Sequence, residues 1–171
     1  EVCIMDQEGN RLTGDAKGEV CIRGDNVTPG YDNNPAANKS SFIGGWFRTG
    51  DQGFFDVDGY LKITGRLKEI INRGGEKISP LEVDNVLMEH PAIQQVITFA
   101  VADRMLGEEI GAAVVLADGG ELDATGLRAY AETHLVKFKI PKHIVFLDEI
   151  PKGATGKLQR IGLAQKLGLE D

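Results

Sequence analysis

The spacing of apolar residues changes in character part-way along the chain. In the first part, short strand-like runs lie at 20–23, 53–56 and 60–63, and the Asp-Gly pair at 58–59 predicts a tight hairpin turn between the last two. The segment 26–45 is rich in Gly, Pro, Asn and Ser, so it is expected to be irregular loop. The first part is therefore predicted to be turn-rich β-structure.

The second part mixes two periodicities. Apolar residues at helical spacing predict helices, and continuous apolar runs predict strands. The expected helices cover 81–89, where His90-Pro91 provides a stop, 127–135 and 158–167; the expected strands cover 96–101, 112–116 and 144–146. The change in pattern falls at residues 66–68. The chain is therefore predicted to be α+β, one small domain with a β-rich tail in front of it.

Composition limits the classes of protein that this chain can represent. A length of 171 residues fits one domain or one domain plus a piece of another. The net charge of −7 argues against broad nucleic-acid binding, and positive charge instead gathers locally, in the segments 66–77, 137–142 and 152–160. No apolar run approaches the length of a membrane helix, and no targeting signal is visible.

The first residues and the cysteines add two expectations. The chain begins at Glu1 inside a strand-like run, which suggests a piece of a longer protein. Cys3 and Cys21 lack metal-ligand or CxxC spacing, so two reduced thiols in a cytoplasmic protein are expected. The three histidines have no nucleophile or carboxylate pattern around them and carry no predicted chemistry.

The segment 65–82, GRLKEIINRGGEKISPLE, is the most informative part of the chain. Gly74 and Gly75 allow positive φ and a close approach of the backbone to a ligand. Four cations surround them and suit a phosphate or a carboxylate: Arg66, Lys68, Arg73 and Lys77. The residues alone leave two interpretations open, an anion site and an ordinary strand–turn–helix connection.

A helix start follows this loop directly. Ser79 is a predicted N-cap, Pro80 occupies the first helical position, and Glu82 would complete a capping box. Ile78 and Val83 are placed to form a hydrophobic staple across the same helix end.

Four motifs in one order resemble the adenylate-forming superfamily, which includes acyl-CoA synthetases, nonribosomal peptide adenylation domains and firefly-type luciferases. They are GEVCIRG at 18–24 with Gly-Tyr at 30–31, FRTGD at 47–51, the segment 65–82, and PKGATGK at 151–157. The resemblance covers nearly the whole chain and is closest to ligases of short acids such as oxalate. It implies that residues 1–66 end a large N-terminal domain and that residues 67–171 form a mobile C-terminal domain.

The resemblance assigns the FRTGD motif and the start of the segment 65–82 to nucleotide binding and to domain motion. Asp51 would hold the ribose hydroxyls of ATP or of the acyl-adenylate, and Arg66 would be the second ribose contact. An Asp after a Gly also fits a simple turn cap, so the residues alone do not decide. Lys68 occupies the hinge position, where rotation of the backbone would pivot the two domains and the side chain need not touch the substrate.

The glycine pair and the final lysine are assigned in the same way. Gly74 and Gly75 would line the channel for the pantetheine arm of CoA, with Lys77 near the CoA or the adenylate. Lys157 would bridge the substrate carboxylate and the α-phosphate during adenylation and is the predicted catalytic residue. The motif is not a Walker phosphate loop, because Pro151 and Leu158 stand where Gly and Ser or Thr are required.

The resulting hypothesis is the C-terminal portion of an AMP-forming acid–CoA ligase. ATP, Mg²⁺ and CoA would serve the intact enzyme, with no metal ligand and no tightly bound cofactor in this segment. The expected partners are ATP or AMP, a carboxylic acid, CoA and an N-terminal domain that holds the main pocket, so the segment alone is expected to be inactive. Two alternatives stay open: an aryl-acid enzyme that loads a carrier protein, and a non-catalytic binding module.

Overall fold

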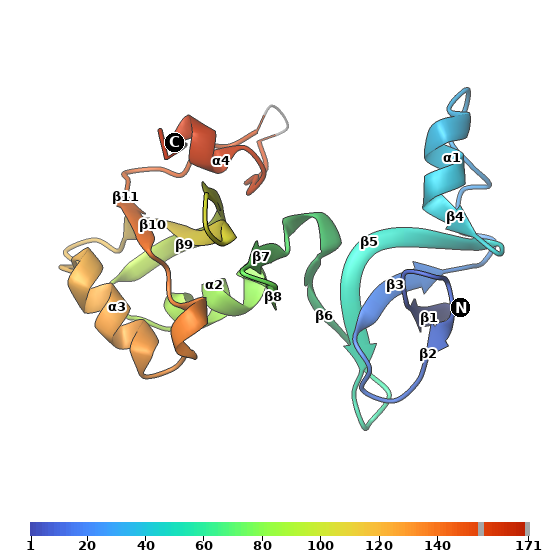
Figure 1. Cartoon of the computed structure of the whole chain (residues 1–171), viewed down its shortest axis with the longest axis horizontal. Coiled ribbons are helices and arrows are strands. Elements are labelled where there is room, and N and C mark those ends of the chain that lie inside the picture. Colours follow the sequence, from blue (N-terminus) through green and yellow to red (C-terminus); the bar gives the residue numbers. More distant parts are fainter. Residues whose placement is uncertain (154–155, 170–171) are drawn as a thin grey trace. The chain divides into compact units, whose positions relative to one another are not determined.

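The computed structural model describes residues 1–153 and 156–169. Within it the chain forms two compact units, Glu1–Lys68 and Glu69–Asp171 (Figure 1). Each unit has its own sheet and its own apolar core, as expected for an α+β chain. Among the described residues, no helix is long and apolar enough to cross a lipid bilayer.

The first unit is built around one antiparallel sheet. Its central strand is β5, which pairs with β3, β4 and β6, while β1 joins β3 to β2. The strands are β1 (Val2–Met5), β2 (Arg11–Leu12), β3 (Gly18–Ile22), β4 (Phe42–Ile43), β5 (Trp46–Phe55) and β6 (Leu61–Arg66). The predicted hairpin at 58–59 is confirmed, because it joins β5 to β6 in antiparallel register.

A small core of sulfur-containing and aromatic side chains holds this sheet together. Cys3, Met5, Cys21 and Trp46 are all buried in it. Both cysteines are free thiols, as predicted, and burial raises the pKa of Cys21 to about 11. Arg11 lies 4.6 Å from the centroid of the indole ring of Trp46, a favourable cation–π contact.

The segment 26–45 contains more regular structure than predicted. Helix α1 (Pro35–Ser41) lies inside it, and β4 follows directly. The side chain of Asn34 accepts a hydrogen bond from the amide of Ala37, and Pro35 occupies the first turn. The Asn-Pro pair is thus a helix start rather than a loop signal, because its N-cap geometry outweighs the polar composition of the segment.

The second unit has a five-stranded sheet centred on β10. One edge of β10 pairs with β9, and the other pairs with β11 in parallel and with the end of β7, which continues to β8. The elements are η1 (Leu67–Glu69, at the boundary), β7 (Ile71–Arg73), β8 (Glu76–Ile78), α2 (Pro80–Met88), β9 (Ile93–Asp103), β10 (Gly107–Leu116), α3 (Ala124–Glu132), η2 (Lys137–Lys139), β11 (His143–Phe146) and α4 (Leu163–Lys166).

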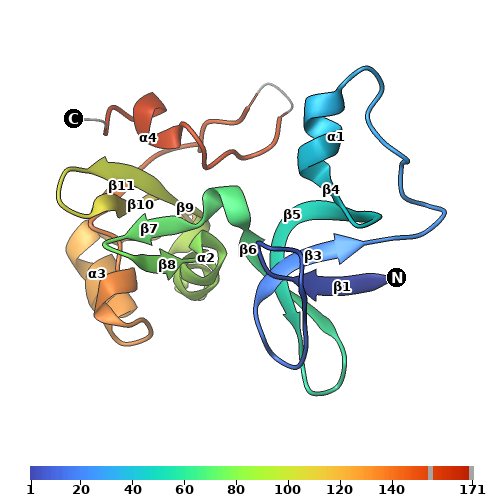
Figure 2. The ribbon, with the colours of Figure 1, turned by 45° about the vertical axis from the view of Figure 1, so that its right-hand side comes forward.

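Both faces of this sheet are covered by helices. Successive side chains of a strand point to opposite faces. Ala112 and Val114 therefore join one buried cluster with residues of α2 and α3, while Ala113 and Val115 join a second cluster with residues of α4. Figure 2 shows α3 and α4 on opposite sides of the strands. Burial on both faces explains why β10 is a continuous apolar run in the sequence.

Two local predictions in this unit were wrong. The last helix starts at Leu163 instead of Leu158, because Leu158 forms an antiparallel bridge with Lys152 and Gly162 has a φ of 75°, which a continuous α-helix does not allow. The capping box is also absent. Ser79 is the N-cap of α2, yet its side chain makes no capping hydrogen bond, and Glu82 instead pairs with Lys139 at 2.5 Å.

Candidate functional site

Asp51 and Arg66 lie directly opposite each other on neighbouring strands. They are register partners in the antiparallel pair of β5 and β6, and Arg66 Nε donates to Asp51 Oδ1 at 2.7 Å. Asp51 was predicted to sit in a turn, but β5 runs through it. Gly50, with a φ of 75°, distorts the strand at this point. The structure thus brings the two predicted nucleotide-binding residues together on one edge of a sheet.

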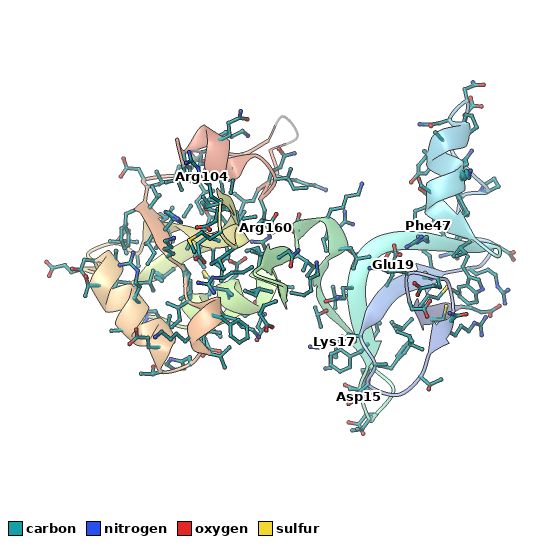
Figure 3. All side chains as sticks on the ribbon, viewed as in Figure 1. Asp15, Lys17, Glu19, Phe47, Arg104 and Arg160 are labelled. Carbon is teal, nitrogen blue, oxygen red and sulfur yellow. The ribbon has the colours of Figure 1, made fainter. Side chains whose placement is uncertain are left out.

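A buried carboxylate supports the backbone behind Asp51. Glu19, on β3, is 6% exposed; it accepts a hydrogen bond from Arg48 Nε at 2.7 Å and another from the amide of Gly50 at 3.0 Å (Figure 3). Thr49 Oγ1 bonds to the strand of Glu19 and accepts from the amide of Asp51. Sequence analysis gave Glu19 no role. The available signal was a glutamate within the GEVCIRG motif, next to the strand-like run at 20–23.

Lys68 lies in the short 3₁₀ turn η1, immediately before the second unit begins. Its side chain is exposed. The next residue, Glu69, is partly buried and forms an ion pair with Arg160 at 3.0 Å. The backbone on the second side of the predicted hinge is therefore anchored.

The two glycines form the turn of a hairpin between β7 and β8. Gly74 and Gly75 have φ values of 58° and 96°, and Arg73 and Glu76 are register partners on either side, as in a type I′ turn. The amide of Gly74 donates to the carbonyl of Leu106 at 2.8 Å, whereas a Cβ at Gly75 would meet no atom within 4 Å. Gly75 therefore presents backbone to open space. Lys77 is exposed on β8.

A second buried carboxylate fixes this hairpin to the sheet. Glu109, on β10, is 1% exposed and pairs with Arg73 Nε at 2.6 Å. Burial alone would raise the pKa of Glu109, but the Arg73 hydrogen bond, an adjacent amide and the nearby charge of Lys142 hold it below its usual value. Glu108 also accepts from the amide of Asn72 at 2.5 Å. Arg73 was expected to be one of the cations that suit an anion, but the structure pairs it with Glu109, so that it supports the glycine turn.

Lys157 lies on a separate hairpin near the end of the second unit. Lys152 and Leu158 form its bridge, and the amide of Gly153 donates to the carbonyl of Lys157 at 2.8 Å. The Lys157 side chain is exposed. Residues 154–155 of the predicted PKGATGK motif lie outside the described residues.

The predicted site residues therefore form three exposed groups. Asp51 and Arg66 belong to the first unit, while the glycine hairpin with Lys77 and the lysine hairpin with Lys157 belong to the second. Among residues 1–153 and 156–169, no group of three or more His, Cys, Asp or Glu could hold a metal ion. What the groups offer is cationic charge, one partly buried carboxylate paired with Arg66, and accessible backbone, which are the elements of anion and hydroxyl recognition.

Comparison with known sequences identifies relatives of nearly the whole chain. Residues 82–157 match the family model of the AMP-binding enzyme C-terminal domain. The chain is 53% identical over 160 residues to the probable CoA ligase CCL9 of Humulus lupulus, covering 94% of this chain and 30% of that protein. It is 51% identical over 165 residues to an oxalate–CoA ligase of Arabidopsis thaliana, covering 96% and 32%. The chain thus spans about a third of the length of these relatives.

Solved structures agree with the sequence relatives. An amide bond synthetase, McbA from Marinactinospora thermotolerans, matches with a TM-score of 0.90 at 37% identity, covering 97% of this chain and 34% of that one. An o-succinylbenzoate CoA synthetase from Bacillus subtilis, solved with its acyl-adenylate intermediate, matches with a TM-score of 0.85 at 36% identity, covering 94% and 32%.

These matches confirm the resemblance that the motifs indicated, including the similarity to oxalate-type ligases. They also agree with the α+β fold. Residues 82–157 are an AMP-binding enzyme C-terminal domain, and the chain belongs to the adenylate-forming superfamily, to which these relatives point.

Proposed function

We propose that the chain is the C-terminal portion of an AMP-forming acid–CoA ligase. The observation that carries this proposal is its identity of about half to two CoA ligases over almost its whole length. In the proposed reaction a carboxylate oxygen attacks the α-phosphorus of ATP, and pyrophosphate leaves. The thiol of CoA then attacks the acyl carbon, the bond to the bridging oxygen breaks, and AMP leaves.

In the first step the chain would supply charge and hydroxyl recognition. Asp51 is acceptor-only when ionised and can take hydrogen bonds from the vicinal ribose hydroxyls, with Arg66 as the second contact. Lys157 would offset the negative charge that gathers between the carboxylate and the α-phosphate, an electrostatic role that needs an exposed, movable lysine. Its exposed position on the hairpin supports this role. Magnesium would enter with ATP as the counter-ion of the substrate.

In the second step the glycine hairpin would line the path of the thiol. A pantetheine arm is thin and needs backbone that it can approach closely. The open space at Gly75 supports this role, as does the rigid anchoring of Gly74 to Leu106. Lys77, on the adjacent strand, would lie near the CoA or the adenylate. Rotation at Lys68 would bring the lysine hairpin and the glycine hairpin to the reaction centre in turn.

The remaining pocket is assigned to the larger part of the N-terminal domain, of which this chain would include only the end, residues 1–66. That domain would hold the phosphate loop, the adenine segment and the acyl pocket. The acid substrate therefore stays open, since the relatives are named for oxalate, sulfoacetate and indoleacetate. A carrier protein in place of CoA and a non-catalytic binding role are the alternatives. A cytoplasmic location is proposed because both thiols are free.

The first prediction separates the whole enzyme from this segment. The full-length protein should release AMP when given ATP, magnesium, CoA and the right member of a panel of short, aryl and fatty acids. The 171-residue segment alone should release none above background, because it lacks the main pocket. AMP release by the segment, or none by the full-length protein with any acid and acceptor, would contradict the proposal.

The second prediction concerns Lys157. In the full-length ligase, Lys157→Ala should lower ATP–pyrophosphate exchange by about 10²–10³-fold, because an aligned charge is lost from the transition state. Thioester formation from prepared acyl-AMP should persist. Lys152→Ala is the matched control: Lys152 is on the same hairpin and pairs with Glu149 at 2.6 Å, so this change should alter neither half-reaction.

Two results would count against that role of Lys157. An unchanged rate of ATP–pyrophosphate exchange in Lys157→Ala would identify Lys157 as a solvated loop lysine. Equal loss of both half-reactions, with an unchanged melting temperature, would mean that Lys157 acts throughout the cycle and that the two steps do not use different hairpins.

The third prediction concerns Gly75. Gly75→Leu should slow thioester formation by about tenfold or more while sparing adenylation, because the side chain enters the path of the thiol. Gly75→Ala carries the same strain at a φ of 96° without the bulk and should be milder. Gly119→Leu, at a φ of 71° with an equally open Cβ position, controls for strain elsewhere in the same unit and should spare both steps.

Thermal stability of each variant has to be measured in parallel. The channel assignment fails if Gly75→Leu reduces both half-reactions equally, or if Gly75→Ala is as slow as Gly75→Leu. In either case Gly75 serves the fold of the hairpin.

A further inference from the structure

Arg160 joins three separate elements of the second unit. Its guanidinium pairs with Asp84 of α2 at 2.7 Å and with Glu69 of η1 at 3.0 Å, and it donates to the carbonyl of Thr98 in β9 at 2.9 Å. Its side chain is only 17% exposed. Figure 3 labels it within the second unit. No motif assignment gave Arg160 a role.

Part of this network completes the edge of the sheet. Among the described strands, β9 pairs only with β10, so its other edge has unpaired backbone groups. At Thr98 the amide donates to Asp84 Oδ1 at 2.7 Å, and the carbonyl accepts from Arg160. Asp84 and Arg160 thus take the place of a neighbouring strand, which satisfies buried backbone groups and blocks pairing with another chain.

Arg160 also anchors the hairpin that carries Lys157. The hairpin is held at its first end by Ile150, which is fully buried under the sheet. At its second end, Leu158 closes the bridge, and Arg160 lies two positions further along the chain. One anchor is therefore apolar and the other ionic, and the ionic anchor is the one nearer to Lys157.

The remaining contact reaches the predicted hinge. Glu69 is the first residue of the second unit, directly after Lys68. The glycine hairpin follows the hinge through the backbone, since β7 starts at Ile71. Lys157 lies far along the chain and has no such covalent link. The Glu69–Arg160 ion pair supplies a non-covalent link instead, because it joins the hinge turn to the base of the lysine hairpin.

We propose that Arg160 is a positioning residue that transmits the orientation of the hinge turn to Lys157 through its ion pair with Glu69. This inference rests on the proposed ligase function. The Glu69–Arg160 ion pair is needed during adenylation, when Lys157 has to reach the α-phosphate. It has little effect on thioester formation, when the glycine hairpin faces the reaction centre. Arg160 should therefore act on adenylation selectively, without touching substrate.

Arginine is suited to this task in a way that lysine is not. Its planar guanidinium presents five donors in a fixed fork and can serve Asp84, Glu69 and a carbonyl at the same time. An ammonium group has the charge but cannot hold this geometry. Arg160→Lys should thus keep the charge balance with Asp84 and lose the fixed link to Glu69.

The test compares the half-reactions of the full-length ligase in Glu69→Gln, Arg160→Lys and the double variant. Pyrophosphate exchange should fall by about tenfold or more in each single variant, because a displaced catalytic group is costly. Thioester formation from prepared acyl-AMP should stay near the wild-type rate. The double variant should be no slower than Arg160→Lys, because both changes break one link. Glu82→Gln, which breaks the Lys139 pair, is the matched control and should change neither rate.

Hydrogen exchange in the same variants tests the link without any activity. Glu69→Gln should raise amide exchange both at residues 67–70 and at residues 156–160, and Glu82→Gln should raise neither. Glu69 is partly exposed, so this variant should fold even if Arg160→Lys does not. If the wild-type enzyme makes no adenylate, the proposed function is refuted. The hydrogen-exchange result would still show whether Glu69 and Arg160 link the hinge turn to the lysine hairpin.

Two outcomes would overturn the role of Arg160. One is an equal fall of both half-reactions in Glu69→Gln, which would indicate a general structural effect. The other is a rise in amide hydrogen exchange at residues 67–70 alone, which would show that the hinge turn and the lysine hairpin move independently.

Discussion

Ion pairs between a buried carboxylate and an arginine stabilise the backbone behind each of the three exposed chemical groups. Glu19 with Arg48 lies behind Asp51, and Glu109 with Arg73 lies behind the glycine turn. Asp84 with Arg160 lies behind the hairpin of Lys157. Removing one partner from such a pair commonly costs about 3–5 kcal/mol, because a buried charge is left uncompensated. The exposed groups can therefore move or bind ligand while their supports stay fixed.

This arrangement would suit the mobile catalytic domain that we propose for the second unit. Lysines and glycine turns on the surface are intrinsically flexible, but chemistry requires them within a fraction of an ångström of a set position. Arg48 and Arg73 each pair with a carboxylate on a neighbouring strand, whereas Arg160 donates to acceptors in the hinge turn, α2 and β9. Rigidity thus comes from a few polar contacts and not from the small apolar core of the first unit alone.

Sequence reasoning succeeded where structure depends on local pattern. The hairpin at 58–59 and the apolar runs of β9 and β10 were predicted because turn chemistry and burial on two faces leave a direct trace in the sequence. The four motifs supplied the candidate site residues through their resemblance to a family, and the roles of these residues stay predictions. The arginine pairs were missed because they join residues far apart in the chain, and a single arginine carries no sign of its partner.

The remaining errors concern the bounds and the ends of helices. The polar segment 26–45 concealed a helix whose start depends on the side chain of Asn34. A glycine at positive φ, Gly162, shortened the last helix, and Glu82 paired with Lys139 instead of completing a capping box. In each case a specific contact or backbone angle outweighed a composition or spacing that favoured another structure.

The most direct test of the central claim follows an oxygen atom through the reaction of the full-length protein. The accepted acid would be supplied with ¹⁸O in its carboxylate, and the products would be analysed by mass spectrometry after one turnover with ATP and CoA. Attack of the carboxylate on the α-phosphorus, followed by thiol attack on the acyl carbon, leaves one labelled oxygen on AMP. Label in AMP and none in pyrophosphate is the predicted result. Label in orthophosphate, with ADP as the nucleotide product, would mean an acyl-phosphate route and would contradict an adenylate-forming ligase.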